Sequence, residues 1–175
     1  MKRNSYFFVA FAVGKWTQDT CREMVFDLRT RVEIPFGEKR IQFFTDGNDD
    51  YTYIFPDYFK TENMDYGQLI KIRENGRVVR KEKRIIFGSL DLDDIETTDV
   101  ENFNSILRER IGRLVRRSKC FTKVKHRLKC SLQLFLFYWN FMKEIQRKTT
   151  PAIMERLSNR VWTWHDFFYY IIKYP

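Results

Sequence analysis

The stretch at residues 41–51, IQFFTDGNDDY, places three aspartates and a glycine directly behind a short apolar run. The apolar run predicts a strand over residues 41–45, which leaves Asp46 at the end of that strand. A carboxylate there is held on rigid backbone, at the sheet edge where α/β folds bind ligands. The same residues also fit an Asx turn that leads into a helix N-cap, and we expect only this role for Asp49 and Asp50. For Asp46 both interpretations, turn residue and metal ligand, stay open.

The flanking sequence alternates between strand and helix patterns, which indicates an α/β fold built in layers. Upstream, residues 6–13 (YFFVAFAV) predict a strand that is buried on both faces. A helix is expected to follow as far as about residue 31, with Thr17 as its N-cap. Downstream, short strands are expected over residues 66–72 and 84–87, and Asn75-Gly76 predicts a tight turn in the basic segment between them.

The second half of the chain is predicted to be helical. Apolar periodicity indicates helices over residues 98–117 and 123–147. Two short helices are expected after Thr150, with Pro151 in the first turn of one of them. The longest apolar run, residues 132–142, is shorter than the roughly 20 residues of a membrane-spanning helix. We therefore expect no membrane-spanning segment.

The composition points to a polyanionic partner. The chain has 175 residues and a formal net charge of +9 at pH 7. Nucleic acid and an anionic membrane surface are the two usual partners of so basic a protein. The three cysteines have no metal-ligand spacing, which argues against structural zinc and favours a reducing, cytoplasmic compartment.

Glu101 lies on the polar face of the helix predicted over residues 98–117. Advancing 100° per residue gathers the apolar side chains into one stripe, Phe103, Ile106, Leu107, Ile111 and Leu114. The opposite face carries Glu101, Asn104, Ser105, Arg108, Gly112 and Arg116. This pattern fits a solvated helix face. It also fits a metal site, because a strand-end aspartate and a helix glutamate can supply two ligands for Mg²⁺ or Mn²⁺ in phosphoryl transfer.

A dense run of positive charge begins on the same helix. Between residues 108 and 129 there are ten lysines and arginines, against Glu109 alone. Such a run would follow a phosphate backbone and give salt-sensitive DNA binding. A solvated helix face is the alternative explanation. The candidate DNA-binding cations in the run are Arg108, Arg110, Arg113, Arg116, Arg117, Lys119 and Lys123.

Several of these segments together resemble the DDE-type insertion-sequence transposases of bacteria and archaea. The segments are FTDGNDDY, LIKIRENGRVV, TTDVENFNSILRERIGRLVRRSKCFTK and FYWNFM, and the tail TPAIMERLSNRVWTWHDFF is similar as well. The resemblance implies a ribonuclease-H-like fold, Mg²⁺ or Mn²⁺ as cofactor, and cleavage and strand transfer of DNA at element ends. By position, Asp46 matches the second metal-binding aspartate and Glu101 the glutamate. Asn104, Arg108 and Arg110 match positions beside the acidic helix that handle DNA.

The sequence departs from that family pattern near its start. The family's first aspartate lies on a strand upstream of the one that corresponds to residues 6–13, and no aspartate precedes Asp19. We therefore expect an N-terminally truncated transposase whose catalytic core lacks its first strand or strands. The partial catalytic domain would span residues 1–147 and a helical tail residues 148–175.

Two functions follow from this expectation. The first is a transposase that is incomplete and inactive alone. The alternative is a non-catalytic, basic DNA-binding protein that modulates an intact transposase. The expected partners are DNA and either a second copy of the chain or an intact transposase. We expect no small-molecule cofactor. The expected location is the cytoplasm, in association with the nucleoid.

Overall fold

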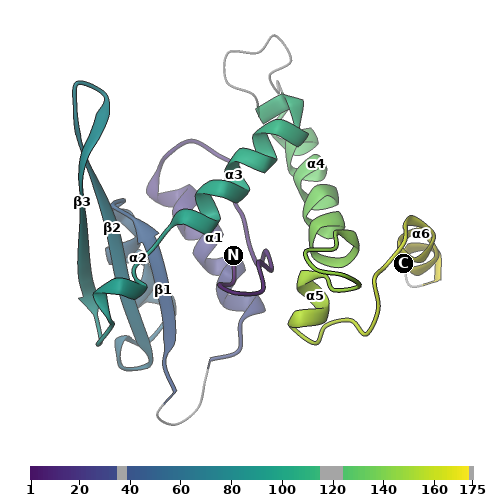
Figure 1. Cartoon of the computed structure of the whole chain (residues 1–175), viewed down its shortest axis with the longest axis horizontal. Helices are drawn as coiled ribbons and strands as arrows, with labels where there is room; N and C mark the ends of the chain where they lie inside the picture. The colour runs from purple at the N-terminus through teal and green to yellow at the C-terminus, as the bar shows by residue number, and fades with distance from the viewer. Residues whose placement is uncertain (35–38, 115–123, 174–175) are drawn as a thin grey trace. The chain divides into compact units, whose positions relative to one another are not determined.

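The computed structural model describes residues 1–34, 39–114 and 124–173 and divides the chain into two compact units (Figure 1). The first, here called the sheet unit, is Ala10–Ser105. The second, the helical unit, combines Met1–Val9 with Ile106–Pro175. Strands and helices both occur, so the α/β class is confirmed. The family-based division at residue 147 stays a prediction.

The sheet unit is built on three strands in the order β1-β2-β3. They are β1 (Ile41–Asp46), β2 (Met64–Glu74) and β3 (Arg77–Phe87). β1 and β2 are parallel, and β2 and β3 are antiparallel. A parallel pair needs a crossover connection, and α2 (Asp50–Tyr58) with a short 3₁₀ turn (Thr61–Asn63) provides it. β1 is one residue longer than the predicted strand over residues 41–45, and Asp46 is its last residue.

A core of aromatic and aliphatic side chains joins one face of this sheet to α2 and to α1 (Gln18–Arg31). The ring of Phe43 on β1 stacks on Phe55 of α2, with centroids 4.6 Å apart, and Tyr66 on β2 meets Phe55 edge-on at 5.0 Å. Val25 of α1 is fully buried in the same cluster. The predicted cap of α1 is confirmed, because the Thr17 side chain accepts a hydrogen bond from the Thr20 amide.

The predicted Asn75-Gly76 turn joins β2 to β3. Both residues have positive φ, 48° and 79°, as a two-residue type I′ hairpin turn requires. The strands themselves are longer than predicted, since the basic segment expected to connect them continues both ladders as far as the turn. Charged side chains can point to solvent from a strand without disturbing its backbone pairing. The charged residues were therefore a poor indication of where these strands end.

The prediction of a strand over residues 6–13 is wrong, because these residues form no ladder with any described strand. In the helical unit, side chains bind the backbone instead. The Phe8 amide donates to Asn140 Oδ1 at 2.9 Å, and Asn140 Nδ2 donates to the Phe8 carbonyl at 2.9 Å. Trp139 Nε1 adds a bond to the Tyr6 carbonyl at 3.1 Å. Buried backbone polar groups need partners, and a carboxamide meets that need here in place of a neighbouring strand.

The helices of the second half differ from prediction mainly in their ends. α3 covers Thr98–Arg110, a 3₁₀ turn follows at Gly112–Leu114, and residues 115–117 of the predicted helix lie outside the described residues. α4 (Lys125–Phe137) continues as a π-helical turn (Tyr138–Met142) and ends there, short of residue 147. Its end coincides with a tight turn in which the Lys148 amide bonds to the Glu144 carboxylate at 2.7 Å.

The tail folds as the two predicted short helices, α5 (Pro151–Met154) and α6 (Trp164–Lys173). Thr150 caps α5, and Pro151 stands in its first turn as predicted. Phe137 packs between the rings of Phe141 and Phe167 at centroid distances of 4.9 and 4.6 Å. These aromatic contacts make a second core, which belongs to the helical unit.

Candidate functional site

Asp46 ends β1 with its side chain exposed, opposite Leu69 of β2. The turn that follows is an Asx turn, as the sequence allowed, and its acceptor is Asn48. The Asn48 side-chain oxygen accepts from the Asp50 amide at 3.1 Å, while Asp49 makes no side-chain cap bond. Asp46 takes no part in that bond, so the turn does not account for it.

The charge of Asp46 affects the pKa values of three side chains between the sheet and its helices. Burial raises the pKa of the Cys21 thiol to about 11, and the charge of Asp46 adds to that shift. Burial is also the main cause that raises the pKa of Tyr51 and of Tyr66, and Asp46 contributes to both. None of these three groups is therefore poised as a nucleophile or base near neutral pH.

Glu101 lies in the first turn of α3, and two side chains hold its carboxylate. Lys71 of β2 forms an ion pair with Glu101 Oε1, and Thr97 Oγ1 donates to the same oxygen at 2.6 Å. The hydrogen bond from Lys71 is the main cause that lowers the pKa of Glu101, followed by the bond from Thr97. Glu101 is thus ionised and already neutralised by an ammonium group.

Lys71 links the elements that carry the two candidate ligands. It stands two residues beyond Leu69, the β2 partner of Asp46. With strands ~4.8 Å apart and a rise of ~3.3 Å per residue, the Cα atoms of Asp46 and Lys71 are about 8 Å apart. Sequence reasoning missed Lys71. The available signal was a lysine inside the apolar strand pattern LIKI.

The carboxylate of Glu101 is only partly available to a metal ion. Within residues 1–34, 39–114 and 124–173, no group of three or more His, Cys, Asp or Glu side chains is placed to hold a metal ion. One oxygen of Glu101 is taken by Lys71 and Thr97. A metal ion at Asp46 and Glu101 stays a prediction, and it would compete with Lys71 and Thr97 for that oxygen.

The predicted DNA-binding residues are only partly visible. Asn104 is half-buried, and Arg108 and Arg110 are exposed in the last turn of α3. The apolar stripe of this helix is confirmed, with Phe103, Leu107 and Ile111 buried. The remaining candidates lie outside the described residues, either by side chain or entirely: Arg113, Arg116, Arg117, Lys119 and Lys123.

The start of α4 carries the other described cations of the basic run. Lys125, Arg127 and Lys129, here called the α4 cations, are all exposed. The N-cap residue Val124 supplies no side-chain bond, and the first turn contains no acidic residue. The helix therefore begins with positive side chains, without a cap bond from the Val124 side chain and without an acidic residue in its first turn.

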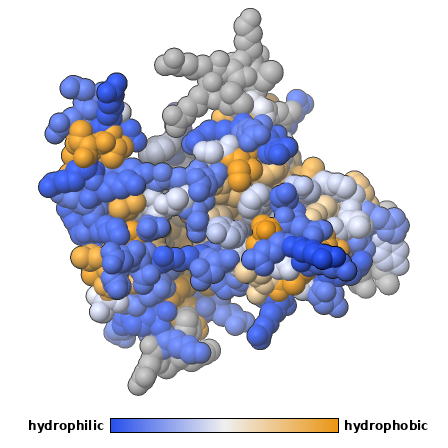
Figure 2. Space-filling view, viewed as in Figure 1, coloured by the Kyte–Doolittle hydropathy of each residue, from blue (hydrophilic) through white to orange (hydrophobic). Residues whose placement is uncertain are grey.

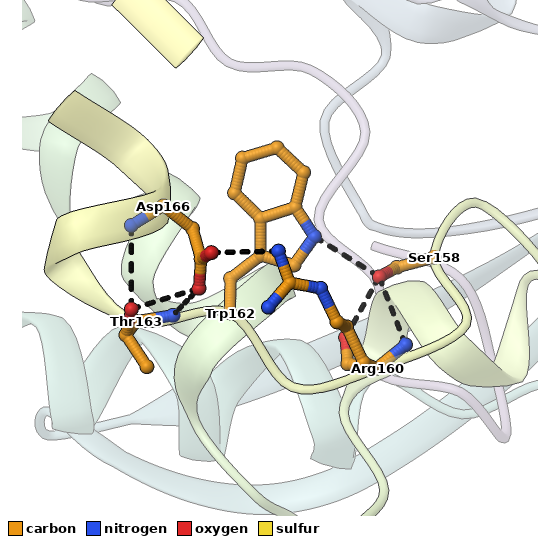
Figure 3. Close-up of polar contacts among 5 residues, drawn as sticks. All are labelled: Ser158, Arg160, Trp162, Thr163 and Asp166. Carbon is orange, nitrogen blue, oxygen red and sulfur yellow. Dashed lines mark hydrogen bonds and ion pairs between the residues drawn. The ribbon is translucent and has the colours of Figure 1, made fainter. Parts of the chain in front are cut away.

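A polar network also precedes α6 (Figure 3). Asp166 accepts from the Thr163 amide at 2.8 Å, from Thr163 Oγ1 at 2.7 Å and from Arg160 at 2.6 Å. These bonds, the backbone one first, lower the pKa of Asp166 to about 2. Ser158 Oγ accepts from Trp162 Nε1 at 3.0 Å and donates to the Arg160 carbonyl at 2.7 Å. The polar groups satisfy one another, so we assign the network to capping α6.

Comparison with known proteins finds no family model, no curated protein and no solved structure that matches this chain. The described helices include none long and apolar enough to cross a membrane. Function must therefore be inferred from the charges and contacts of the residues themselves.

Proposed function

We propose that this chain is a transposase-derived DNA-binding protein. The main supporting observation is the position of the α4 cations at the start of a helix. A helix N-terminus has a partial positive charge, which disfavours a nearby cation by about 0.3–1 kcal/mol. The sequence nevertheless places Lys125 and Arg127 in the first turn, with Lys129 just beyond it and without an acid in that turn. A bound anion would offset this repulsion and would also accept from amide groups of the first turn, which the Val124 side chain does not cap.

A DNA backbone is the anion that suits this surface. Its phosphates are closely spaced and would meet several cations at once, releasing condensed counterions from the DNA. The net charge of +9 attracts the same partner over longer distances. The exposed Arg108 and Arg110 belong to the same basic run in the sequence. The chain would act by competing for element ends or by assembling with an intact transposase.

We propose that this chain binds DNA without cleaving it. Its Glu101 carboxylate is bound by Lys71 and Thr97, so an ion would have to displace an ammonium group to reach that oxygen. Metal ligands in phosphoryl-transfer sites are instead carboxylates that the ion itself neutralises. Binding without cleavage needs only the surface cations.

The test is the salt dependence of duplex DNA binding. Fluorescence anisotropy over a series of sodium chloride concentrations gives the slope of log K against log salt. Replacing all three α4 cations by Gln should reduce the magnitude of this slope by about 2.7, since each phosphate contact contributes ~0.9. A matched control neutralises three exposed cations elsewhere in the helical unit, Lys143, Arg147 and Lys148. Binding that does not vary with salt, or equal slopes in both variants, would refute the proposal.

Catalysis is the second candidate, namely DNA cleavage and strand transfer at insertion-sequence ends. The observation that favours it is that Asp46 and Glu101 lie on elements linked through β2 and Lys71. Supercoiled plasmid incubated with the chain and Mn²⁺ would reveal nicking. Activity that is lost in both Asp46→Asn and Glu101→Gln would support this function. Nicking that persists equally in both variants would exclude these residues as its site.

A further inference from the structure

A two-stranded ribbon extends the sheet beyond the end of β1. The last pair between β1 and β2 is Asp46 with Leu69, whereas β2 and β3 stay paired as far as Glu74 with Arg77. Residues 70–82, here called the basic ribbon, therefore have no β1 residue beside them, and Figure 1 shows the hairpin projecting past β1. The five β2 residues of the ribbon, 70–74, span roughly 17 Å at ~3.3 Å per residue.

The basic ribbon has more cations than its own acids can neutralise. Its five cations are Lys71, Arg73, Arg77, Arg80 and Lys81, and its two acids are Glu74 and Glu82. The net charge of the ribbon is therefore five minus two, or +3. Lys71 is paired with Glu101, and Arg80 with Glu82. Among the described residues no ion pair neutralises the other three, Arg73, Arg77 and Lys81. These three, here called the ribbon cations, are all exposed.

The pairing of β2 with β3 brings positive side chains of the ribbon close together. Lys71 and Lys81 stand directly opposite each other in the ladder, an arrangement that is destabilising for like charges. Glu101 is the acid beside them, and both lysines lower its pKa. A single carboxylate therefore faces two ammonium groups, and a further anion would stabilise the pair.

The end of the ribbon also exposes apolar surface. Val78 and Val79 have exposed fractions of 41% and 53%. The register shifts between Ile72 and Arg73, which leaves Val79 without a pairing partner and marks a bulge. Bulges increase the twist of a ribbon and redirect its side chains. In Figure 2 an apolar patch is visible within the mostly hydrophilic surface of the projecting hairpin.

We propose that the basic ribbon inserts into the major groove of double-stranded DNA. That groove is ~12 Å wide and ~8.5 Å deep and admits a two-stranded ribbon, and the ribbon is longer than the groove is deep. The ribbon cations bind phosphates and base edges, while the two valines contact apolar base surface such as thymine methyl groups. The deep, narrow major groove of A-form RNA does not admit such an element.

This inference rests on the proposed DNA-binding function and assigns to it an element separate from α4. The test measures binding of the full chain to a DNA duplex and to an RNA duplex of the same sequence. The variant replaces Arg73, Arg77 and Lys81 by Gln. The matched control replaces three exposed lysines of the sheet unit for which the described residues provide no side-chain bond, Lys15, Lys39 and Lys60. Circular dichroism checks that both variants remain folded.

We expect the ribbon variant to reduce the magnitude of the DNA salt slope by about 2.7 and the control to change it much less. Methylation of guanine N7, which lies in the major groove, should interfere with binding of the unmodified chain. The chain should also prefer the DNA duplex to the RNA duplex.

Four outcomes would overturn the inference. If the unmodified chain binds no duplex, the proposed function fails and the inference fails with it. If the α4 variant weakens binding but the ribbon variant does not, only the inference fails. If the ribbon variant aggregates but binds DNA normally, its cations serve to protect the exposed edge strand β3. Equal loss of DNA and RNA binding without methylation interference would contradict insertion into the groove.

Discussion

The ion pair between Lys71 and Glu101 allows a quantitative prediction. Replacing Lys71 by Met removes the ammonium group but keeps an apolar stem, which suits a side chain that is 22% exposed. The pKa of Glu101 should rise toward its ordinary value, yet stay below it, because Thr97 still donates and Lys81 remains nearby. The Glu101 side chain is 48% exposed, so water screens the pair. A screened pair of this kind contributes about 0.2–1 kcal/mol to stability.

The pH dependence of stability follows from the direction of this shift. The pKa of Glu101 is lower in the folded chain than in the unfolded one. The pair therefore stabilises the fold above the unfolded pKa, and this stabilisation is lost as the pH falls through the folded pKa. Unfolding free energies of the unmodified chain and Lys71→Met should differ near neutral pH and converge in acid.

Carbon-13 NMR titration of the Glu101 carboxyl group measures the shift directly. Arg80→Met is the matched control, since Arg80 is a cation of the same hairpin that pairs with Glu82. It should leave the pKa of Glu101 unchanged. An unchanged or lower pKa of Glu101 in Lys71→Met would refute the assignment of Lys71 as its main partner.

Three further predictions concern the fold. Asn140→Leu removes both 2.9 Å bonds to Phe8 and should cost about 1–3 kcal/mol in urea unfolding, with faster hydrogen exchange at the Phe8 amide; unchanged exchange would contradict it. Gly76→Ala should destabilise the hairpin by about 1 kcal/mol, because φ is 79°, and a neutral or stabilising result would argue against the turn. Iodoacetamide should alkylate buried Cys21 more slowly than exposed Cys130 near neutral pH, with the Cys21 rate rising toward its pKa of about 11; equal rates would contradict its burial.

Local chemistry made much of the fold predictable. Thr17 as a cap, Pro151 in a first turn and Asn75-Gly76 in a hairpin act through neighbours only a few residues away. All three are confirmed. The α3 stripe was predictable because helical periodicity fixes which side chains share a face.

Partners that are distant in sequence were not predictable. The apolar run at residues 6–13 looks like a strand, but its composition does not say whether a strand or a carboxamide will bind its backbone. Asn140, which binds Phe8, lies 132 residues away. Lys71 and Glu101 likewise meet across 30 residues, so sequence patterns identified the acid but not the base that neutralises it.

The bonds between Phe8 and Asn140 also have a consequence for biosynthesis. Because Met1–Val9 belongs to the helical unit, the sheet unit is an insertion between two parts of that unit. Ala10–Ser105 leaves the ribosome as a continuous segment and can fold early, as domains do during translation. Residues 1–9 precede the sheet unit, but their bonds to Asn140 can form only after residue 140 has been translated. A segment that is translated before the sheet unit is therefore completed only after it.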